Sequence, residues 1–384
     1  MRFRHPDGGL VHLSYCTNVH AAEDLGGLVT QLARYAEPVR ERLGTSTLGL
    51  GLWLARGVAT ELIDDDRAVA RLRAELAARG LEVVTLNGFP YRGFQDPVVK
   101  HKVYAPDWSQ PERLHYTLDL ARLLGRLLPE DAGAGSVSTL PLAWRTPWLS
   151  QRRAAAAANL DRLAEGLAKL AAETGRPVRV GFEPEPGCVV ETTAQAATQL
   201  SDVDGEWLGV CLDTCHLAVA FEDPAAALGR LAAAGLPVVK AQASAALQAD
   251  HPDDPDTRSA LRSFVEPRFL HQTRSATGNG TDDLDLALAG GLPGDSAWRV
   301  HFHIPLHAEP AAPLASTRPV LRDTLAGLLG GPTALTRHVE VETYTWHVLP
   351  NAPRDDAGLV EGLAAELDWT RRELTVLGLK DVSA

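Results

Sequence analysis

The sequence of 384 residues has few cysteines and no long hydrophobic run. Its four cysteines show no C-x-x-C spacing, which argues against a zinc ribbon, a dithiol redox site or a disulfide framework. No stretch approaches the ~18 uninterrupted apolar residues of a membrane span, and the first residues lack the apolar core of a secretory signal. We therefore expect a cytoplasmic protein whose thiols are buried and reduced.

Clustered positive charge is missing as well. The chain carries 37 Lys and Arg against 49 Asp and Glu, a formal charge of −12. Nucleic acids and anionic membranes bind clusters of basic residues, so neither is an expected partner. No G-x-G-x-x-G turn follows the first predicted strand, and neither a P-loop nor a serine nucleophile elbow is present. A dinucleotide cofactor, a P-loop enzyme and a serine hydrolase are therefore not expected.

Short β-rich segments alternate along the chain with longer Ala- and Leu-rich segments of helical period. The predicted strands span residues 12–18, 48–54, 81–89, 136–141, 178–186, 208–216, 238–244 and 338–346. Eight such units favour a closed (β/α)8 TIM barrel over an open sheet. We predict an α/β fold in which residues 1–384 form one barrel domain, with a final helix over residues 357–377.

The alternation of strands and helices is interrupted after the seventh predicted strand, where residues 245–298 are rich in Asp, Pro and Gly. A ninth strand candidate follows in RVHFHIPL, residues 299–306. We predict an insertion over residues 245–307, in which residues 269–273 and 299–306 form a hairpin. A loop of this length is usually functional or disordered, and a lid, a partner surface and a dimer arm all remain open.

Strand parity predicts which polar side chains point into the barrel. In residues 178–186, Val178, Val180 and Phe182 share one face, which leaves Glu183 and Glu185 on the other. The same alternation directs these residues inward: Cys211, Asp213, Lys240, Gln242, His338, Glu340 and Glu342, with His216 just past its strand.

Carboxylates at the ends of several barrel strands converge where barrel enzymes build their active sites. Such a cluster in a partly dry pocket requires protonation, cationic partners or a divalent metal, and a metal is the most economical of the three. Oxygen ligands with one amide or imidazole suit Mg, Mn, Co or Zn. We expect Glu183 and Asp213 in this site. Glu342 is preferred over Glu340 because it lies nearer the strand end, although the two are nearly even.

Further candidates for chemistry lie close to these strand ends. Glu185 is either a catalytic base or a salt-bridged rim residue. His216 binds substrate, orients a carboxylate or makes a simple loop hydrogen bond. His301 and His303 share one face of RVHFHIPL, where they add ligands or a general acid, or merely pack.

The candidates for binding substrate are Asn18, Asn87, Lys240, His271, His301 and Trp346. Asn18 and Asn87 end strands one and three, where amides can hold hydroxyl groups, although Asn before Gly88 is also ordinary turn chemistry. Trp346 would supply an apolar wall under a sugar ring, or belong to the core.

The strand-end motifs resemble the xylose-isomerase-like superfamily of sugar phosphate isomerases and epimerases. The resemblance rests on Glu183, the D-x-x-H of Asp213 to His216, Gln242 and a closing glutamate. In the epimerases of that group four such residues bind one metal, so the resemblance implies Glu183, Asp213, Gln242 and Glu342 as ligands. Gln242 departs from the pattern, since a histidine is commoner there.

Phrases over nearly the whole chain also resemble the metabolite-traffic protein E family of the Ebo gene clusters. They are HLSYCTNVH, TLNGFPYRGF, VYAPDWSQPERL, STLPL, LDTCHLAVAFE, VHFHIPL and ETYTWHVLP. That family is associated with moving or maturing secondary-metabolite precursors, which implies other proteins of the same gene cluster as partners.

These patterns together predict a metal-dependent isomerase or epimerase acting on a small polyhydroxylated metabolite, a sugar or a cyclitol. Its catalytic residues would be Glu185, His216 and His303, and its cofactor one divalent ion of Mn, Mg, Co or Zn. The alternative is a carrier barrel without catalysis, which retains a metabolite in the same pocket for partner proteins.

Overall fold

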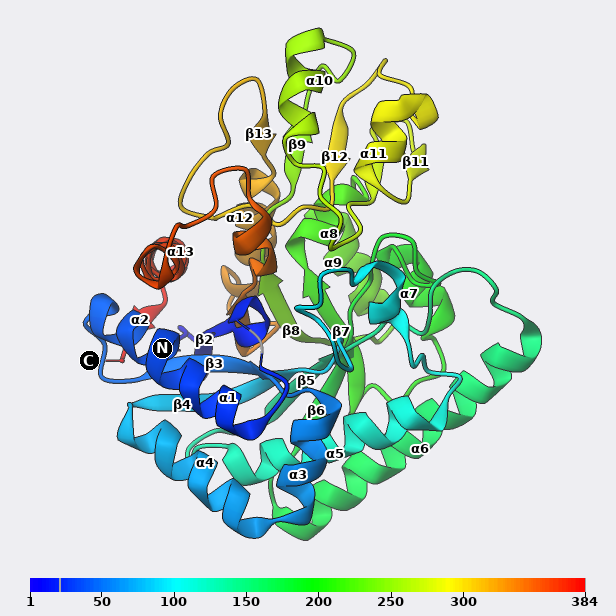
Figure 1. The fold of residues 1–384 in the computed structure, drawn as a ribbon. Coiled ribbons are helices and arrows are strands. Elements are labelled where there is room, and N and C mark those ends of the chain that lie inside the picture. The colour runs from blue at the N-terminus through cyan, green and yellow to red at the C-terminus, as the bar shows by residue number, and fades with distance from the viewer. Residues whose placement is uncertain (21, 384) are drawn as a thin grey trace.

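The computed structural model describes residues 1–20 and 22–383 and contains a closed barrel of eight parallel strands (Figure 1). The barrel closes because β14 pairs with both β8 and β2. Its strands are β2 (Leu10–Cys16), β3 (Leu48–Trp53), β4 (Leu81–Asn87), β5 (Gly135–Thr139), β6 (Val178–Phe182), β7 (Leu208–Asp213), β8 (Val238–Ala243) and β14 (His338–Val341). The predicted TIM barrel is confirmed.

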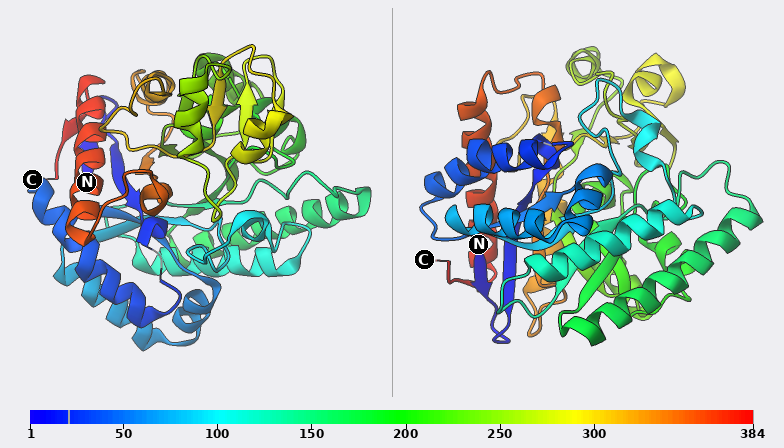
Figure 2. Two further views of the ribbon diagram at one scale, coloured as in Figure 1. Left: turned by 45° about the horizontal axis from the view of Figure 1, so that its top comes forward. Right: turned by 60° about the horizontal axis from the view of Figure 1, so that its bottom comes forward.

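Helices cover the outside of the barrel (Figures 1 and 2). They are α1 (Leu25–Gln31), α2 (Glu37–Leu43), α3 (Arg56–Asp64), α4 (Asp66–Ala78), α5 (Pro111–Leu127), α6 (Ser150–Thr174), α7 (Thr193–Gln199), α8 (Thr214–Val219), α9 (Pro224–Ala233), α12 (Arg318–Leu329) and α13 (Asp356–Val376). The final helix, α13, lies where the sequence predicts it. Both termini meet beside it, because β1 (Arg2–Arg4) pairs with β15 (Lys380–Asp381).

The predicted strands run past the observed ends. β7 stops at Asp213 because its carboxylate caps α8 by accepting a hydrogen bond of 2.9 Å from the backbone N–H of His216. β14 stops at Val341, and the chain turns into a short 3₁₀ helix over Tyr344–Val348. Glu183 and Glu342 therefore lie just beyond their strands, at the rim of the barrel.

The insertion after β8 stands above the barrel in Figure 1 and forms a second sheet in the order β11-β10-β12-β9-β13. Its elements are β9 (Leu247–Ala249), α10 (Pro255–Arg262), β10 (Thr273–Ser275), β11 (Gly280–Thr281), α11 (Leu284–Leu286), β12 (Trp298–Val300) and β13 (Ala315–Ser316). A separate hydrophobic cluster, including Leu247, Trp298 and Phe302, fills it. The sheet also includes β13, beyond the predicted limit at residue 307.

The predicted hairpin needs correction. Of its two segments only Thr273 and residues 299–300 lie in paired strands, with Thr273 opposite Val300. The chain leaves the ladder at His301, where the backbone N–H of Phe302 bonds to Val300 and that of Ile304 to Ala245. His301 and His303 thus lie on an irregular segment that crosses the mouth of the barrel.

The barrel interior below its mouth holds a buried ion pair, in which the Oε1 atom of Glu340 has no hydrogen-bond partner. The Lys240 ammonium donates to the Glu340 carboxylate, and both side chains are fully buried. A Cβ atom at Gly51 would collide with that carboxylate, so the pair requires a residue without a side chain on β3.

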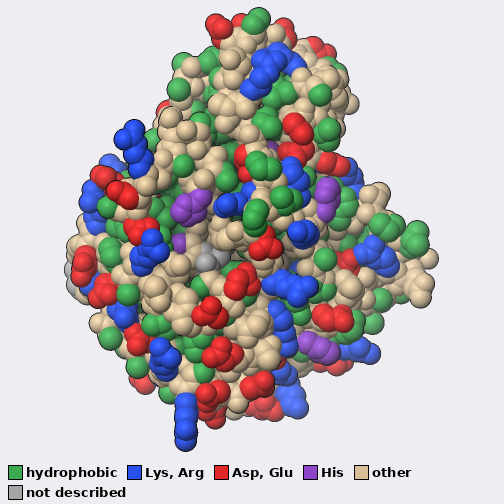
Figure 3. Space-filling model, viewed as in Figure 1, with side chains coloured by type: hydrophobic (Ala, Val, Ile, Leu, Met, Phe, Trp, Pro, Cys, Tyr) green, Lys and Arg blue, Asp and Glu red, His purple; other side chains and the backbone are tan. Residues whose placement is uncertain are grey.

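Acidic and basic side chains are interspersed over the face of the molecule shown in Figure 3. Among the residues that the structure describes, no helix is both long and apolar enough to span a membrane.

Candidate active site

A pocket of about 520 Å³ opens at the carboxyl ends of the barrel strands, between the barrel and the insertion. Eight of the predicted site residues line it: Asn18, Asn87, Glu183, Glu185, His216, His301, His303 and Glu342. Aromatic side chains form its apolar wall, namely Phe89, Phe94, Tyr104, Phe269 and Tyr344. The pocket therefore combines a polar floor with an apolar entrance.

Three buried carboxylates form the floor. Glu183, Asp213 and Glu342 each offer an oxygen, and the three oxygens lie within 4.8 Å of one another. Within residues 1–20 and 22–383 no lysine or arginine forms an ion pair with any of them. The Oε2 atom of Glu183 and the Oδ2 atom of Asp213 have no hydrogen-bond partner. Three like charges thus meet without compensation.

The burial and mutual repulsion of these carboxylates raise the pKa values of Glu183 and Glu342. Burial, then the neighbouring Glu342 and Asp213, raises the pKa of Glu183 well above its usual range. Burial, then Asp213 and Glu340, raises the pKa of Glu342 to about 8. Without a cation the cluster therefore retains protons at neutral pH.

Two amides fix the Glu342 carboxylate. Asn18 donates to its Oε1 atom at 2.7 Å and Asn87 donates to the same oxygen at 3.0 Å. The Asn87 amide also contacts the Cys16 thiol at 3.3 Å. The two asparagines, placed by sequence as substrate ligands, thus orient a carboxylate at the pocket floor.

Two further side chains offer atoms that lack partners beside the carboxylates. Neither the oxygen nor the nitrogen of the Gln242 amide has a hydrogen-bond partner, and Gln242 lies opposite Asp213 in the β7–β8 register. His303 donates through Nδ1 to the backbone oxygen of Glu342 at 2.6 Å, which leaves Nε2 unpartnered, 3.9 Å from Asp213 Oδ2. Burial lowers the pKa of His303 to about 4, so its ring is neutral.

These unpartnered oxygen and nitrogen atoms fit a divalent metal. Three carboxylates with one amide oxygen or one imidazole form a donor set for a hard or borderline ion. The residues that would hold it are Glu183, Asp213 and Glu342, with Gln242 or His303 as the fourth ligand.

A second group lies beside the carboxylates. His216 Nε2 is 3.0 Å from His301 Nε2 and 3.2 Å from an oxygen of Glu185. Tyr104 donates to the other oxygen of Glu185 at 2.8 Å. Burial raises the pKa of Glu185 to about 6, whereas His216 and Tyr104 oppose this shift.

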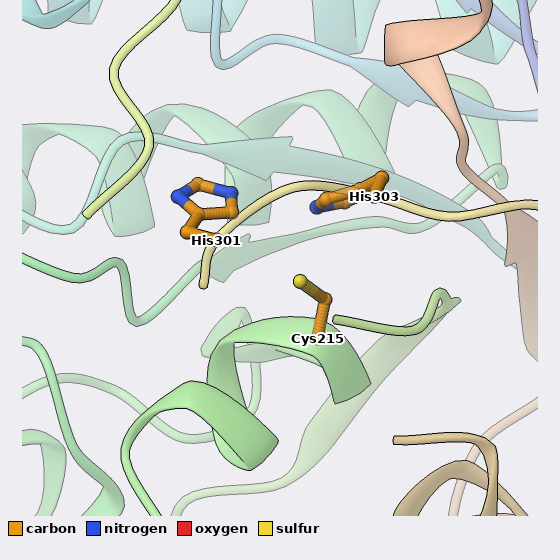
Figure 4. A group of neighbouring side chains, drawn as sticks. All are labelled: Cys215, His301 and His303. Carbon is orange, nitrogen blue, oxygen red and sulfur yellow. The ribbon is translucent and has the colours of Figure 1, made fainter. Parts of the chain in front are cut away.

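Figure 4 shows His301 and His303 on the segment of the insertion that they share, with the thiol of Cys215 pointing toward it from α8. The three side chains bring ligand atoms within 4.8 Å of one another. Burial raises the pKa of the Cys215 thiol well above its usual range, so the thiol stays protonated and is a poor ligand.

Three predicted substrate ligands lie outside the pocket lining. Lys240 is paired with Glu340 in the layer below. Both ring nitrogens of His271 are engaged, by the His301 backbone oxygen at 2.9 Å and by Glu266 at 2.8 Å. The Trp346 indole donates to Glu366 at 2.8 Å and faces another groove. These side chains make internal contacts outside the pocket lining, and their binding of substrate stays a prediction.

Sequence reasoning missed three side chains that position the site. Ser244 donates to Asp213 Oδ1 at 2.8 Å, Tyr104 holds Glu185, and Gln272 accepts from His301 Nδ1 at 2.7 Å. Ser244 ends the predicted strand 238–244 on the same face as Lys240 and Gln242, which was a usable signal. Tyr104 ends a 3₁₀ helix over Lys100–Tyr104, and Gln272 lies just before β10, so neither belongs to a barrel strand.

The fold and this site define a (β/α)8 barrel with a carboxylate and histidine centre at the carboxyl ends of its strands. Residues 50–257 match a family model described as xylose isomerase-like TIM barrel. The chain belongs to that family.

Solved structures extend the likeness to nearly the whole chain. An L-ribulose 3-epimerase is 14% identical, with a TM-score of 0.52 over 96% of each chain. A D-allulose 3-epimerase from Methylomonas sp. is 13% identical, with a TM-score of 0.51 over 97% of this chain and 100% of that one. At these identities the likeness concerns the fold. A search of curated protein sequences found no significant match.

Proposed function

We propose that the protein is a metal-dependent isomerase or epimerase of a small polyhydroxylated compound, a sugar or a cyclitol. In line with the resemblance to the Ebo metabolite-traffic family, it would process or move a secondary-metabolite precursor in the cytoplasm, together with proteins of the same gene cluster. The named epimerases that share its fold act on sugars, which supports this substrate class.

One observation carries the proposal: Glu183, Asp213 and Glu342 converge without a lysine or arginine partner in the described part of the chain, and two of them keep an unpartnered buried oxygen. Burying charged groups without compensation costs several kcal/mol per ion, roughly, so the cluster has little structural use. A divalent ion would balance the charge and stabilise an enediolate on neighbouring substrate oxygens.

The side chains themselves have separable roles. Asn18 and Asn87 keep the Glu342 carboxylate oriented through its Oε1 atom. Glu183 or Glu342 would accept the proton from a substrate carbon, since both carboxyl groups line the pocket. The aromatic wall would exclude water from the pocket.

Glu185 and His216 lie beside the carboxylate cluster, with His216 Nε2 3.2 Å from an oxygen of Glu185. Glu185 has a pKa of about 6, close to neutral, as a group that exchanges protons with a substrate hydroxyl requires. His216 is held through Nδ1 by the Pro184 backbone oxygen at 2.8 Å, so its Nε2 atom faces the pocket.

The alternative is a carrier that retains a metabolite without turnover. The apolar entrance formed by Phe94, Phe269 and Tyr344 favours it, because these rings pack against one another with centroids 4.8–5.5 Å apart. Such a wall suits a ligand with an apolar part.

The test combines metal analysis with proton exchange. Protein reconstituted with Mn, Mg, Co or Zn is incubated with a panel of sugars and cyclitols in D₂O, and deuterium at carbon is followed by NMR. We expect incorporation that Glu342→Gln abolishes. A metal-loaded protein that binds a panel compound yet exchanges no carbon-bound proton would favour the carrier.

A further inference from the structure

Glu366 is a buried carboxylate that the proposed chemistry does not use. It lies on α13, its side chain is fully buried, and it does not line the pocket at the barrel mouth. In the part of the chain that the structure describes, only neutral groups hold it. Burial raises its pKa to about 7, although its hydrogen bonds lower it. Because burying a carboxylate is costly, its contacts indicate what it does.

Donors from the insertion and from the turn after β14 converge on this carboxylate. Its Oε1 atom accepts from the backbone N–H of Leu306 at 2.9 Å and from the Thr343 hydroxyl at 2.6 Å. Its Oε2 atom accepts from the Trp346 indole at 2.8 Å. A glutamine offers one acceptor oxygen beside a donor nitrogen, whereas an ionised glutamate offers two oxygens that only accept. The three donors therefore require a carboxylate.

Two of these donors are close in sequence to candidate metal ligands. Thr343 directly follows Glu342, and Leu306 lies three residues after His303 on the segment that crosses the mouth. Both donors bond to the same oxygen of Glu366. The two segments also meet at the ligands themselves, where His303 Nδ1 donates to the Glu342 backbone oxygen at 2.6 Å. Glu366 thus closes a ring of contacts that includes both candidate ligands.

Helix α13 has a glycine where it approaches the indole. Gly362 lies four residues before Glu366 and therefore on the same face of the helix. A Cβ atom at Gly362 would lie 2.4 Å from the Cη2 atom of Trp346, which is closer than side chains can pack. Glycine is unfavourable in the middle of a helix, but here the missing side chain admits the ring that donates to Glu366.

We propose that Glu366 is a positioning residue, which fixes the spacing between Glu342 and His303 at the metal site. It acts through Thr343 and Leu306. This role rests on the proposed function and deepens it, since it connects a ligand of the barrel with a candidate ligand of the insertion. A shift of either segment would move one ligand atom relative to the other, and metal affinity depends on that geometry.

The experiment compares Glu366→Leu with the wild type by titration with Mn²⁺, Mg²⁺, Co²⁺ and Zn²⁺ in turn. Glu366→Leu removes all three acceptor contacts. We expect metal affinity to fall by about tenfold, the low end of the range for residues that support a ligand, because Glu366 acts through its neighbours. Thr343→Val removes one contact, so its loss should be smaller. The double variant should lose no more than Glu366→Leu alone, because both changes break the same contact.

Hydrogen exchange of the metal-free protein gives a second readout. Mass spectrometry follows the backbone amides of residues 300–307 and of residues 342–348. In Glu366→Leu both segments should exchange faster than in the wild type, since both lose the carboxylate that joins them.

Further variants separate positioning from stability. Thr117→Val removes a buried hydroxyl on α5 that donates to the Arg113 backbone oxygen at 2.9 Å, so metal affinity should stay at the wild-type value. If Glu366→Leu does not fold, as judged by circular dichroism, Glu366→Gln takes its place, because it keeps the shape but presents a donor to one of the three groups.

Wild-type metal affinity in folded Glu366→Leu, or losses that add in the double variant, would overturn the positioning role and leave the proposed function intact. A wild-type protein that binds none of the four ions would instead contradict the proposed function. Hydrogen exchange then decides the positioning role, which fails if either segment keeps its wild-type rate in Glu366→Leu.

Discussion

Buried charges are paired in one layer of the barrel interior and unpaired in another. In the lower layer Lys240 and Glu340 neutralise each other, and Gly51 leaves room for the pair. At the mouth, Glu183, Asp213 and Glu342 lie together without a lysine or arginine partner among the described residues. The charges of the first arrangement balance, although the Oε1 atom of Glu340 has no hydrogen-bond partner, whereas no lysine or arginine balances the second.

The difference separates structural from functional polar residues. Inward direction alone does not identify a site, since both layers point into the barrel. What distinguishes the mouth is the combination of raised pKa values with unpartnered oxygens. Buried groups that stay unsatisfied in the protein are available for a ligand.

We expect the largest loss of metal affinity when one carboxylate at the mouth of the barrel is replaced by a neutral side chain. Asp213→Asn keeps an oxygen to cap α8 but removes one charged ligand, so metal affinity should fall by more than the ~100-fold seen for residues that only support a ligand. Isothermal titration with Mn²⁺ measures it. Asp223→Asn is a matched control, because Asp223 caps α9 in the same way, on the surface. Equal affinity in both variants would refute the role of Asp213.

Breaking the lower layer should affect stability instead. Lys240→Met leaves Glu340 buried without its partner, and we expect a loss of about 3–5 kcal/mol in the free energy of unfolding. Urea denaturation measures it. In Lys240→Met/Glu340→Gln the loss should shrink, and bound metal should equal that of the wild type. A double variant without metal would show that the two layers are not independent.

A supporting residue of the mouth should have an intermediate effect. Asn87→Leu removes one of the two amides on Glu342 Oε1, so metal affinity should fall by about 10–100-fold. Direct titration with metal measures the change. Asn159→Leu, at a buried asparagine that bonds to the Trp108 backbone, controls for loss of a buried amide. It should leave metal affinity unchanged.

The smallest expected effect is the pH dependence of the free energy of unfolding of the metal-free protein. Burial raises the pKa of Glu342 from 4.5 to about 8, so the folded metal-free protein holds a proton there that the unfolded chain releases. Its contribution to stability is present at low pH and is lost as pH rises toward 8. Between pH 6.5 and 8.5 we expect a loss of roughly 2 kcal/mol.

Urea denaturation of the metal-free protein at the two pH values tests this slope. Below pH 6.5 the lowered pKa of His303 acts in the opposite sense, which is why the window begins there. Glu342→Gln should reduce the slope to the part that Glu183 contributes, because burial raises the pKa of Glu183 as well, and saturating metal should remove it. A slope that is unchanged in Glu342→Gln would assign the titration to another group.

Much of the fold could be predicted because periodicity is local. Each of the eight strands and the final helix appears as a pattern of buried positions that neighbouring residues alone define. Strand ends were less accurate, since the cap at Asp213 depends on the first turn of α8. The insertion was harder still, because its two- and three-residue strands show no period.

The sequence by itself determined the barrel and the inward direction of Glu183, Asp213 and Glu342, because alternation along a strand needs no knowledge of the rest of the chain. Only the tertiary structure decided that Lys240 is neutralised while these three are not, and that His301 faces His216. Those relations join residues distant along the chain, and the distances and hydrogen-bond directions that define them arise only when the barrel closes and the insertion folds over its mouth.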